Sequence, residues 1–211
     1  MRMRIALAVV AVLIGVSACE SSQSGTPIAS KGSGETSPSS AKPTKSSEPT
    51  SDLPAYGAPK VSSPLKTDKF ETDPCSVFTQ EKLREYGVGQ GEVNTDEGGK
   101  VCTWETDDAG AIDLGWDTLK PRGITRFYQG NKNKDYAFFD VLPDIEGFPA
   151  VSYSTKDYRR DGICTVAVGV ADNRMFMVSL ALSKSKRQTH DPCGVAATVA
   201  TDAATSMKAG A

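Results

Sequence analysis

Cysteines are the residues of this chain best suited to form covalent bonds, and of the five the first, Cys19, stands far from the rest. The other four are widely spaced, at Cys75, Cys102, Cys164 and Cys193. Structural zinc sites and thioredoxin-like redox sites use short C-x-x-C spacings, which these cysteines lack. An even number of cysteines in an exported chain instead predicts two disulfides, for which three connectivities are possible.

The N-terminus has the features of an export signal. Arg2 and Arg4 precede an apolar run over residues 5–16, which is too short for a membrane span of about 20 residues. The run ends in Val16-Ser17-Ala18-Cys19, which resembles the lipobox of bacterial lipoproteins. We therefore expect cleavage before Cys19, acylation of its thiol by lipid such as palmitate, and a membrane anchor on the extracytoplasmic face. The alternative is an ordinary secretory peptide with an incidental cysteine.

Groups for acid–base or nucleophilic catalysis are sparse. His190 is the only histidine, and its place beside Asp191-Pro192-Cys193 indicates a loop near a helix start. The carboxylates of Asp107-Asp108 and of Asp144 with Glu146 could serve glycoside hydrolysis as pairs, but turn formation and solvation are the commoner roles of such residues. The sequence predicts no catalytic residue, no metal site and no cofactor.

Composition divides the chain into three parts. Residues 1–18 form the predicted lipoprotein signal peptide, and residues 19–68 a lipidated tether. The tether is rich in Ser, Thr, Pro, Gly, Lys and Glu, which cannot bury enough apolar surface to offset the entropy of ordering, so we expect disorder. Residues 69–211 form the predicted folded domain, and residues 53–70 an extended lead-in that lies partly on it.

Helices and strands alternate in the domain. A helix is predicted from Gln80, where Thr79 can cap its start and Gly87 can end it. A second helix is expected over residues 123–129 and an alanine-rich helix over residues 191–208. Strands are predicted over residues 101–105, 111–116, 148–154, 162–170 and 175–182.

The last two predicted strands carry two alternating apolar sets, which are Cys164, Val166, Val168 and Val170, and then Phe176, Val178, Leu180 and Leu182. A three-residue loop at residues 171–173, with Asn173 left-handed, would bring both sets to one face, whereas a two-residue turn would separate them. The opposite face would carry small residues, which suit solvent or a closely packed helix: Thr165, Ala167, Gly169, Ser179 and Ala181. The expected fold is α+β, an antiparallel sheet with helices packed on one face.

This register favours one disulfide connectivity. Cys164 would lie at the end of the hairpin from which Leu182 leaves toward Cys193, so Cys164–Cys193 is favoured and Cys75–Cys102 remains. Each bond would join a strand to the start of a helix. Loops of this length contribute about 3 to 4 kcal/mol in the chain-entropy description.

The same register predicts a basic patch. The turn at residues 157–161 and the segment 183–188 would share one end of the sheet, which gathers Arg159, Arg160, Lys184, Lys186 and Arg187. Such a patch could bind an anionic wall polymer, membrane headgroups or an acidic envelope protein, or be a solvated charge cluster with no partner. Trp104 and Trp116 are expected in the core, with a ligand groove as the alternative, and residues 129–135 as a surface loop or a mobile loop over a pocket.

Several motifs together are similar to those of a family of actinobacterial lipoproteins that carry a domain of unknown function. They are the lipobox, the Ser/Pro/Thr-rich tether, Asp73-Pro74-Cys75, Cys102-Thr103-Trp104, Phe148-Pro149-Ala150-Val151, the segment 164–172 and Asp191-Pro192-Cys193. The resemblance implies an α+β fold and a location at the cell surface. It supplies no catalytic residues.

Composition narrows the function classes. The chain is 38% hydrophobic with a net charge of −2, which excludes a multi-span membrane protein and a wholly disordered chain and argues against a nucleic-acid partner. We expect a non-enzymatic binding or interaction module of the cell envelope, attached to the membrane by its lipid. The alternatives are an envelope-acting hydrolase that uses a carboxylate pair, and a carrier of a small apolar ligand.

Overall fold

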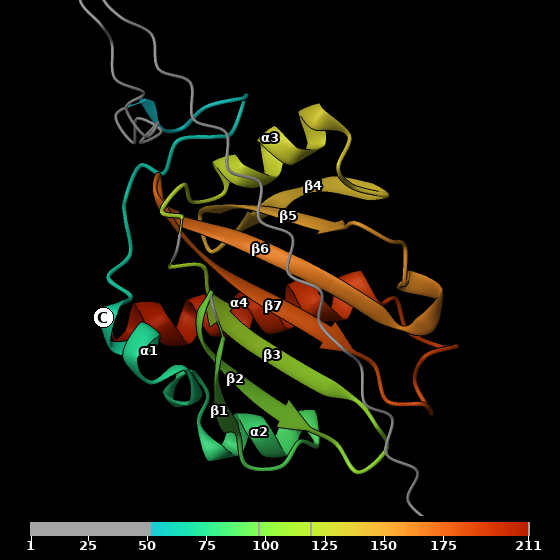
Figure 1. The fold of residues 1–211 in the computed structure, drawn as a ribbon. Coiled ribbons are helices and arrows are strands. Elements are labelled where there is room, and N and C mark those ends of the chain that lie inside the picture. Colours follow the sequence, from blue (N-terminus) through green and yellow to red (C-terminus); the bar gives the residue numbers. More distant parts are fainter. Residues whose placement is uncertain (1–51, 97, 119, 211) are drawn as a thin grey trace, which may run out of the picture. The chain divides into compact units, whose positions relative to one another are not determined.

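The computed structural model describes residues 52–96, 98–118 and 120–210; Cys19, the predicted signal peptide and tether residues 19–51 lie outside them. The described residues form a seven-stranded antiparallel sheet in the order β1-β2-β3-β7-β6-β5-β4 (Figure 1). Its strands are β1 (Glu92–Asp96), β2 (Gly99–Glu105), β3 (Ala111–Trp116), β4 (Phe138–Ile145), β5 (Phe148–Ser154), β6 (Ile163–Ala171) and β7 (Arg174–Ala181). The five predicted strands are confirmed, and β1 and β4 are the edge strands that sequence reasoning missed.

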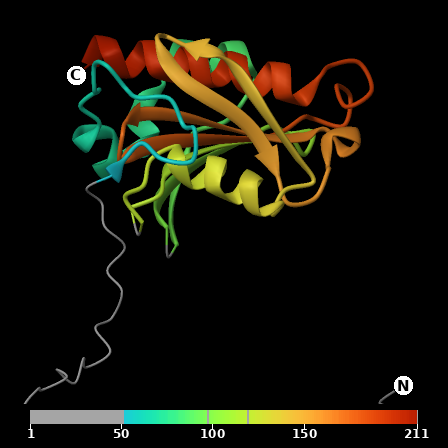
Figure 2. The same cartoon turned by 90° about the horizontal axis from the view of Figure 1, so that it is seen from above.

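One face of the sheet is covered by the helices from both ends of the domain, which confirms the predicted α+β fold. The long helix α4 (Pro192–Gly210) packs on β6 and β7. The shorter elements are α1 (Asp68–Thr72), η2 (Pro74–Val77) and α2 (Gln80–Tyr86). Figure 2 shows α4 and the green N-terminal helices on the same side of the sheet. We call this side the covered face and the other side the open face.

Helix α4 lies close to the sheet because its inner surface is small. After Pro192, its buried residues recur at helical spacing and are Ala196, Val199, Ala200, Ala203, Ala204 and Met207. The strand side chains beneath them, such as Val166 and Val168, are fully buried. Asp191 caps the helix, since its carboxylate accepts hydrogen bonds from the backbone N–H of Gly194 at 2.8 Å and of Cys193 at 3.3 Å.

The predicted ends of α2 are confirmed. The Thr79 side chain accepts a hydrogen bond from the Lys82 backbone N–H at 3.3 Å. Gly87 ends the helix in the left-handed region with φ of 69°, a conformation that costs little only for glycine. From the end of α2, Tyr86 donates a hydrogen bond to Asp202 of α4 at 2.6 Å, which joins the two helices.

In the β6–β7 hairpin, both apolar sets lie on one face as predicted, but the connecting loop differs from the prediction. Cys164 pairs with Leu180, Val166 with Val178, and Val168 with Phe176, so both apolar sets lie on the covered face. The turn holds only two residues, because Ala171 pairs with Arg174, and Asn173 is not left-handed. A register shift between Gly169 and Ala171 supplies the extra residue that restores the facing. The expected three-residue loop was therefore wrong, and a β-bulge takes its place.

Both disulfides have the predicted connectivity. Cys75 is bonded to Cys102 and Cys164 to Cys193, each with Cα atoms 5.1 Å apart. Cys102 and Cys164 point to the covered face, where each is fully buried, and their partners stand at the start of η2 and α4. Each bond therefore fastens a helical element to the same face of the sheet.

Helix α3 (Thr125–Asn133) lies on the open face, opposite α4 (Figure 2). Its core contacts with the sheet include Phe127, Val151 and Ala167. The expected helix over residues 123–129 was too short, and the expected loop over residues 129–135 is largely helical. Its polar composition marks a solvent-facing helix surface, while Lys134 ends the helix in the left-handed region with φ of 64°.

The lead-in to the domain lies against the sheet and α3, as expected. The Val61 N–H donates to Asp172 Oδ1 at 2.9 Å, and the Leu65 N–H to the Val170 carbonyl at 2.9 Å. The Ala55 N–H donates to the hydroxyl of Thr125 at 3.2 Å. Of the residues predicted as tether, 52–68 are thus placed on the domain.

Gly91 generates a prediction about the packing around the first disulfide. A Cβ atom at this position would lie 2.5 Å from Cys102 Sγ and 2.5 Å from Trp104 Nε1, both of which are buried. Gly91→Ala should therefore lower the free energy of unfolding by about 1 to 3 kcal/mol through overpacking. Urea unfolding of the oxidised protein measures this change.

Gly89→Ala is the matched control, because a Cβ there would meet only the Glu105 carbonyl oxygen, at 3.7 Å. Its effect should stay within about 0.5 kcal/mol, as for most exposed substitutions. Equal stabilities of the two variants would contradict the packing described for Gly91.

Candidate functional site

The open face carries a pocket of about 520 Å³ beside α3, where the helix leaves strands β3 and β7 uncovered. We call it the open-face pocket. Its lining comes from non-consecutive parts of the chain: Gly98, Val101, Asp113, Gly115, Trp116, Asp117, Lys120, Arg126, Tyr153, Thr165, Met177 and Ser179. Concave sites of this size that combine apolar surface with a few polar groups are the usual places of ligand binding.

Strand register places a row of polar side chains across the open face. Thr103 pairs with Asp113, Asp113 with Ser179, Ser179 with Thr165, and Thr165 with Tyr153, on five neighbouring strands. Directly paired residues point to the same face, so the row runs unbroken from β2 to β5. The floor of the open-face pocket is therefore polar along this line.

Hydrogen bonds connect neighbours in the row. The Thr103 hydroxyl donates to Asp113 Oδ1 at 2.6 Å, and the Thr165 hydroxyl to Ser179 Oγ at 3.1 Å. Tyr153 lies at the α3 end, where its hydroxyl contacts Met177 Sδ at 3.4 Å. These bonds orient groups that remain partly exposed and can form hydrogen bonds with a polar ligand.

The second row of the floor is apolar and has a glycine at its centre. Val101 pairs with Gly115, and Gly115 with Met177, on the same face as the polar row. Gly115 cannot carry a side chain here, since a Cβ would lie 2.7 Å from Val101 Cγ2. The absence of a side chain at Gly115 keeps the floor low between Asp113 and Asp117.

The wall of the pocket holds an ion pair. Arg126 projects from α3 and pairs with Asp117, which follows β3. The Lys120 backbone N–H donates to Asp117 Oδ1 at 3.4 Å. The side chain of Lys120 is exposed at the rim of the pocket. The pair ties α3 to the end of β3, and it neutralises the two charges in the wall.

The sequence-predicted catalytic candidates lie outside this pocket. Asp108 accepts a hydrogen bond from the Ser185 N–H at 2.9 Å, Glu146 pairs with Lys208 at 2.9 Å, and His190 Nδ1 meets the Thr189 hydroxyl at 2.8 Å, all on exposed turns and ends. Among the described residues, no three His, Cys, Asp or Glu side chains are placed to hold a metal. Whether any of these groups takes part in catalysis stays a prediction.

The two tryptophans are buried, as expected. Trp104 is fully buried and packs on Phe78, with ring centroids 5.2 Å apart. Trp116 is 3% exposed and also borders the open-face pocket. Aromatic residues of α3 and β5 pack together beneath the helix, where Phe127 and Tyr153 have ring centroids 4.1 Å apart.

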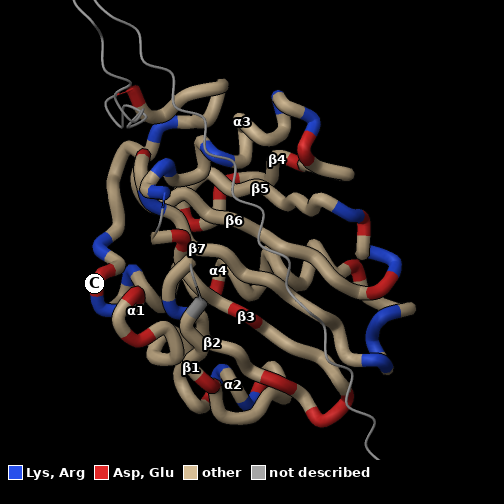
Figure 3. Tube along the Cα trace, in the orientation of Figure 1, with Lys and Arg blue, Asp and Glu red and all other residues tan. Residues whose placement is uncertain are grey.

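The predicted basic patch residues lie at one end of the sheet, and acidic residues, Asp157 and Asp161, flank the two arginines of its first segment (Figure 3). The Leu182 N–H donates to the Gly162 carbonyl at 2.8 Å, which joins the two segments of the patch. Arg187 donates to the carbonyl oxygens of Leu182 and Ala109, at 3.0 and 3.3 Å. An anionic wall polymer as the partner of this end stays a prediction.

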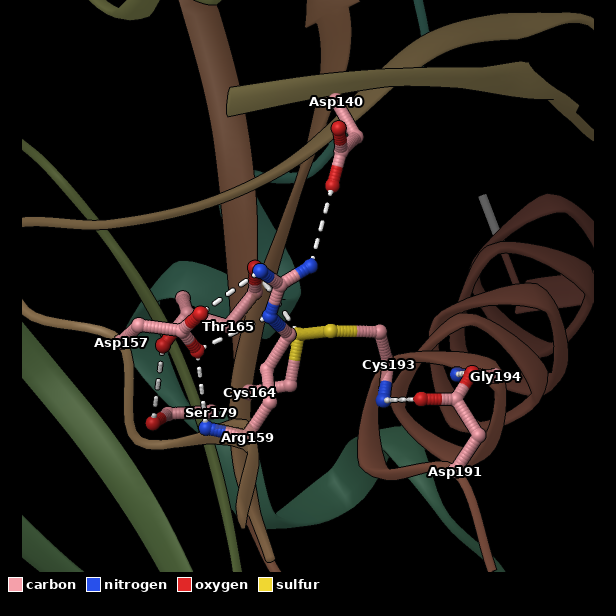
Figure 4. The surroundings of a disulfide bond; sticks show 9 residues. All are labelled: Asp140, Asp157, Arg159, Cys164, Thr165, Ser179, Asp191, Cys193 and Gly194. Carbon is pink, nitrogen blue, oxygen red and sulfur yellow. Dashed lines mark hydrogen bonds and ion pairs between the residues drawn. A yellow bond between two sulfur atoms is a disulfide. The ribbon is translucent and has the colours of Figure 1, made fainter. Parts of the chain in front are cut away.

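Among the patch residues, Arg159 forms ion pairs with neighbouring carboxylates. Its guanidinium lies between Asp157, at 2.7 Å, and Asp140, at 3.6 Å, close to the Cys164–Cys193 disulfide (Figure 4). The side-chain hydrogen bonds from Arg159 lower the pKa of Asp157 to about 2. Arg159 is therefore already paired within the protein.

The sequence analysis did not predict the open-face pocket, although two residues of a predicted strand indicate it. Asp113 and Gly115 stand inside the predicted strand 111–116, where aspartate and glycine are both depleted. A glycine in a strand interior often marks the close approach of another group. The residues of the wall, Asp117 and Arg126, give no such signal, because only the packing of α3 brings them together.

Comparison with known proteins identifies a family and no activity. A family model described as a protein of unknown function, DUF3558, matches residues 14–206, which is most of the chain. No curated protein matches the chain, and no solved structure matches it. No helix in the described part of the chain is long and apolar enough to cross a membrane. The expected domain of unknown function is confirmed, while the actinobacterial and lipoprotein features stay predictions.

Tyr153 yields a prediction about the pH dependence of the pocket. Its burial raises the pKa of the phenol to about 12, an effect that the charge of Arg126 reduces. Since an unfolded tyrosine has a pKa of about 10, the fold favours the neutral phenol, and this stabilisation is present below about pH 10 and lost as the pH rises toward about 12.

An ultraviolet titration of phenolate tests this. The difference between the curves of the wild type and Tyr153→Phe should have its midpoint near pH 12, with circular dichroism to verify that the sheet persists. A difference curve centred near pH 10 would contradict the burial of Tyr153.

Proposed function

Since the chain belongs to the DUF3558 family of proteins of unknown function, we propose its function from its own residues. The protein is a lipid-anchored, extracytoplasmic binding module and not an enzyme. It holds a small ligand in the open-face pocket. The single observation that carries this proposal is the polar row of Asp113, Ser179, Thr165 and Tyr153 on the floor of a pocket of about 520 Å³. A partly apolar hollow with a few convergent polar groups is the usual form of a small-ligand site.

Export is supported by the two disulfides and by the N-terminal sequence. Disulfides form and persist in oxidising compartments outside the cytosol, and the chain contains two. The signal-like run and the lipobox-like Val16-Ser17-Ala18-Cys19 precede the tether, so acylation of Cys19 would hold the domain at the extracytoplasmic face of the membrane.

The geometry favours binding over hydrolysis. A glycosidase needs two carboxyl groups that flank the substrate as acid and base or nucleophile. The carboxylates of the open-face pocket are Asp113 and Asp117, and Asp117 is paired with Arg126. A carrier of a wholly apolar ligand is disfavoured by the Asp113 carboxylate, because hydrocarbon over this charge would remove its solvation without supplying a cation to pair with it.

A variant that fills the pocket tests the proposed function. Ser179 lies on the floor, so Ser179→Phe should displace any ligand without reaching the covered face. Wild-type protein incubated with a small-molecule extract of the cell envelope should retain a compound in native mass spectrometry, and Ser179→Phe should retain about tenfold less or none.

Thr198→Phe is the matched control, since Thr198 is exposed on α4 and faces away from the sheet. It should retain the compound as the wild type does. Retention by both variants would refute the pocket as the binding site.

A second variant tests the anchor. Cys19→Ala removes the thiol that would accept the lipid, so the protein should lose the mass of the acyl chains and leave the membrane fraction of its native cells. Ser22→Ala, just outside the lipobox-like motif, should keep both properties. Unchanged mass and membrane association in Cys19→Ala would contradict lipidation at this residue.

A further inference from the structure

Four charged side chains line the open-face pocket, and three of them are compensated or solvated. Arg126 and Asp117 form an ion pair in the wall. Lys120 is exposed at the rim, where water and salt weaken the effect of its charge. The fourth charge, the carboxylate of Asp113, lies on the floor.

Asp113 is oriented but not neutralised. The Thr103 hydroxyl donates to Asp113 Oδ1 at 2.6 Å and in turn receives a long hydrogen bond of 3.5 Å from Asn94 Nδ2. Among the residues that the structure describes, no Lys or Arg pairs with Asp113, and no group donates a hydrogen bond to Oδ2. Other carboxylates of the domain, such as Asp157 and Glu146, have cationic partners.

From this arrangement we infer that the ligand of the open-face pocket carries a protonated amine, which pairs with Asp113. The inference rests on the proposed function, since it names the ligand class for the same pocket. A carboxylate on a partly enclosed, partly apolar floor attracts a cation more strongly than one in open solvent does. An ammonium group also supplies N–H donors for the open lone pairs of Oδ2.

The neighbours of Asp113 define the rest of the ligand. Gly115 and Met177 form an apolar surface on one side, and the Ser179 hydroxyl lies opposite Asp113 on β7. An amine attached to a compact apolar ring would place its ring over Gly115 and Met177 while its ammonium group reaches Asp113. A carboxylate ligand would meet the like charge of Asp113 and be repelled.

Three probes that share a benzene ring and differ in charge test the charge requirement: benzylammonium, benzyl alcohol and benzoate. Each is titrated into the oxidised protein, and the backbone amide signals of Asp113, Gly115 and Ser179 are followed by NMR. Benzylammonium should shift these signals, and the alcohol and the acid should bind about tenfold more weakly or not at all. Asp113→Asn keeps the shape and the Thr103 contact, so it should weaken benzylammonium by about tenfold or more, the loss expected for a charge-assisted hydrogen bond.

Asp107→Asn is the matched control, because it removes one negative charge from an exposed turn outside the pocket. It should leave benzylammonium binding unchanged. Equal binding of benzylammonium and benzyl alcohol would overturn the amine requirement while the pocket remained a binding site. If no probe shifts the pocket signals, the amine inference is overturned, and retention of an envelope compound by the wild type but not by Ser179→Phe would separately uphold the proposed function.

Discussion

The two disulfides attach helical segments to one face of the sheet, and α3 covers only part of the opposite face. Cys102 and Cys164 both point to the covered face, and each is bonded to a residue at the start of η2 or α4. Because side chains alternate along a strand, the residue next to each cysteine in its strand points to the open face. Thr103 and Thr165, which directly follow the two cysteines, therefore belong to the polar row of the open face.

Helix α3 then divides the open face into two parts with different roles. Where the strand residues are Ala167 and Gly169, the helix approaches closely, and a Cβ on Gly169 would already lie 3.1 Å from Ile124. At Thr165 and Ser179, α3 does not cover the sheet, and these residues line the open-face pocket. Small residues can thus serve both a packed helix and a solvated floor, and the position of α3 decides which.

Alternation and cysteine spacing were sufficient to predict the α+β fold, the covered face and both disulfide pairs. They were not sufficient for the loop of the last hairpin, since a bulge at Gly169–Ala171 and a longer turn have the same effect on facing. The pocket depends on contacts between distant segments, above all Arg126 with Asp117, and no local pattern encodes such a contact. What the sequence does contain is the unusual pair of Asp113 and Gly115 inside one strand.

The lead-in segment connects the N-terminal part of the chain to the wall of the pocket. Ala55 donates a hydrogen bond to Thr125, a fully buried residue in the first turn of α3, and Tyr56 meets Gln129 one turn further along. Arg126 stands between these two contacts on the same helix. The segment that leads from the predicted anchor thus holds the helix that carries the cation of the pocket wall, and the position of Arg126 over the floor depends on that segment as well as on Asp117.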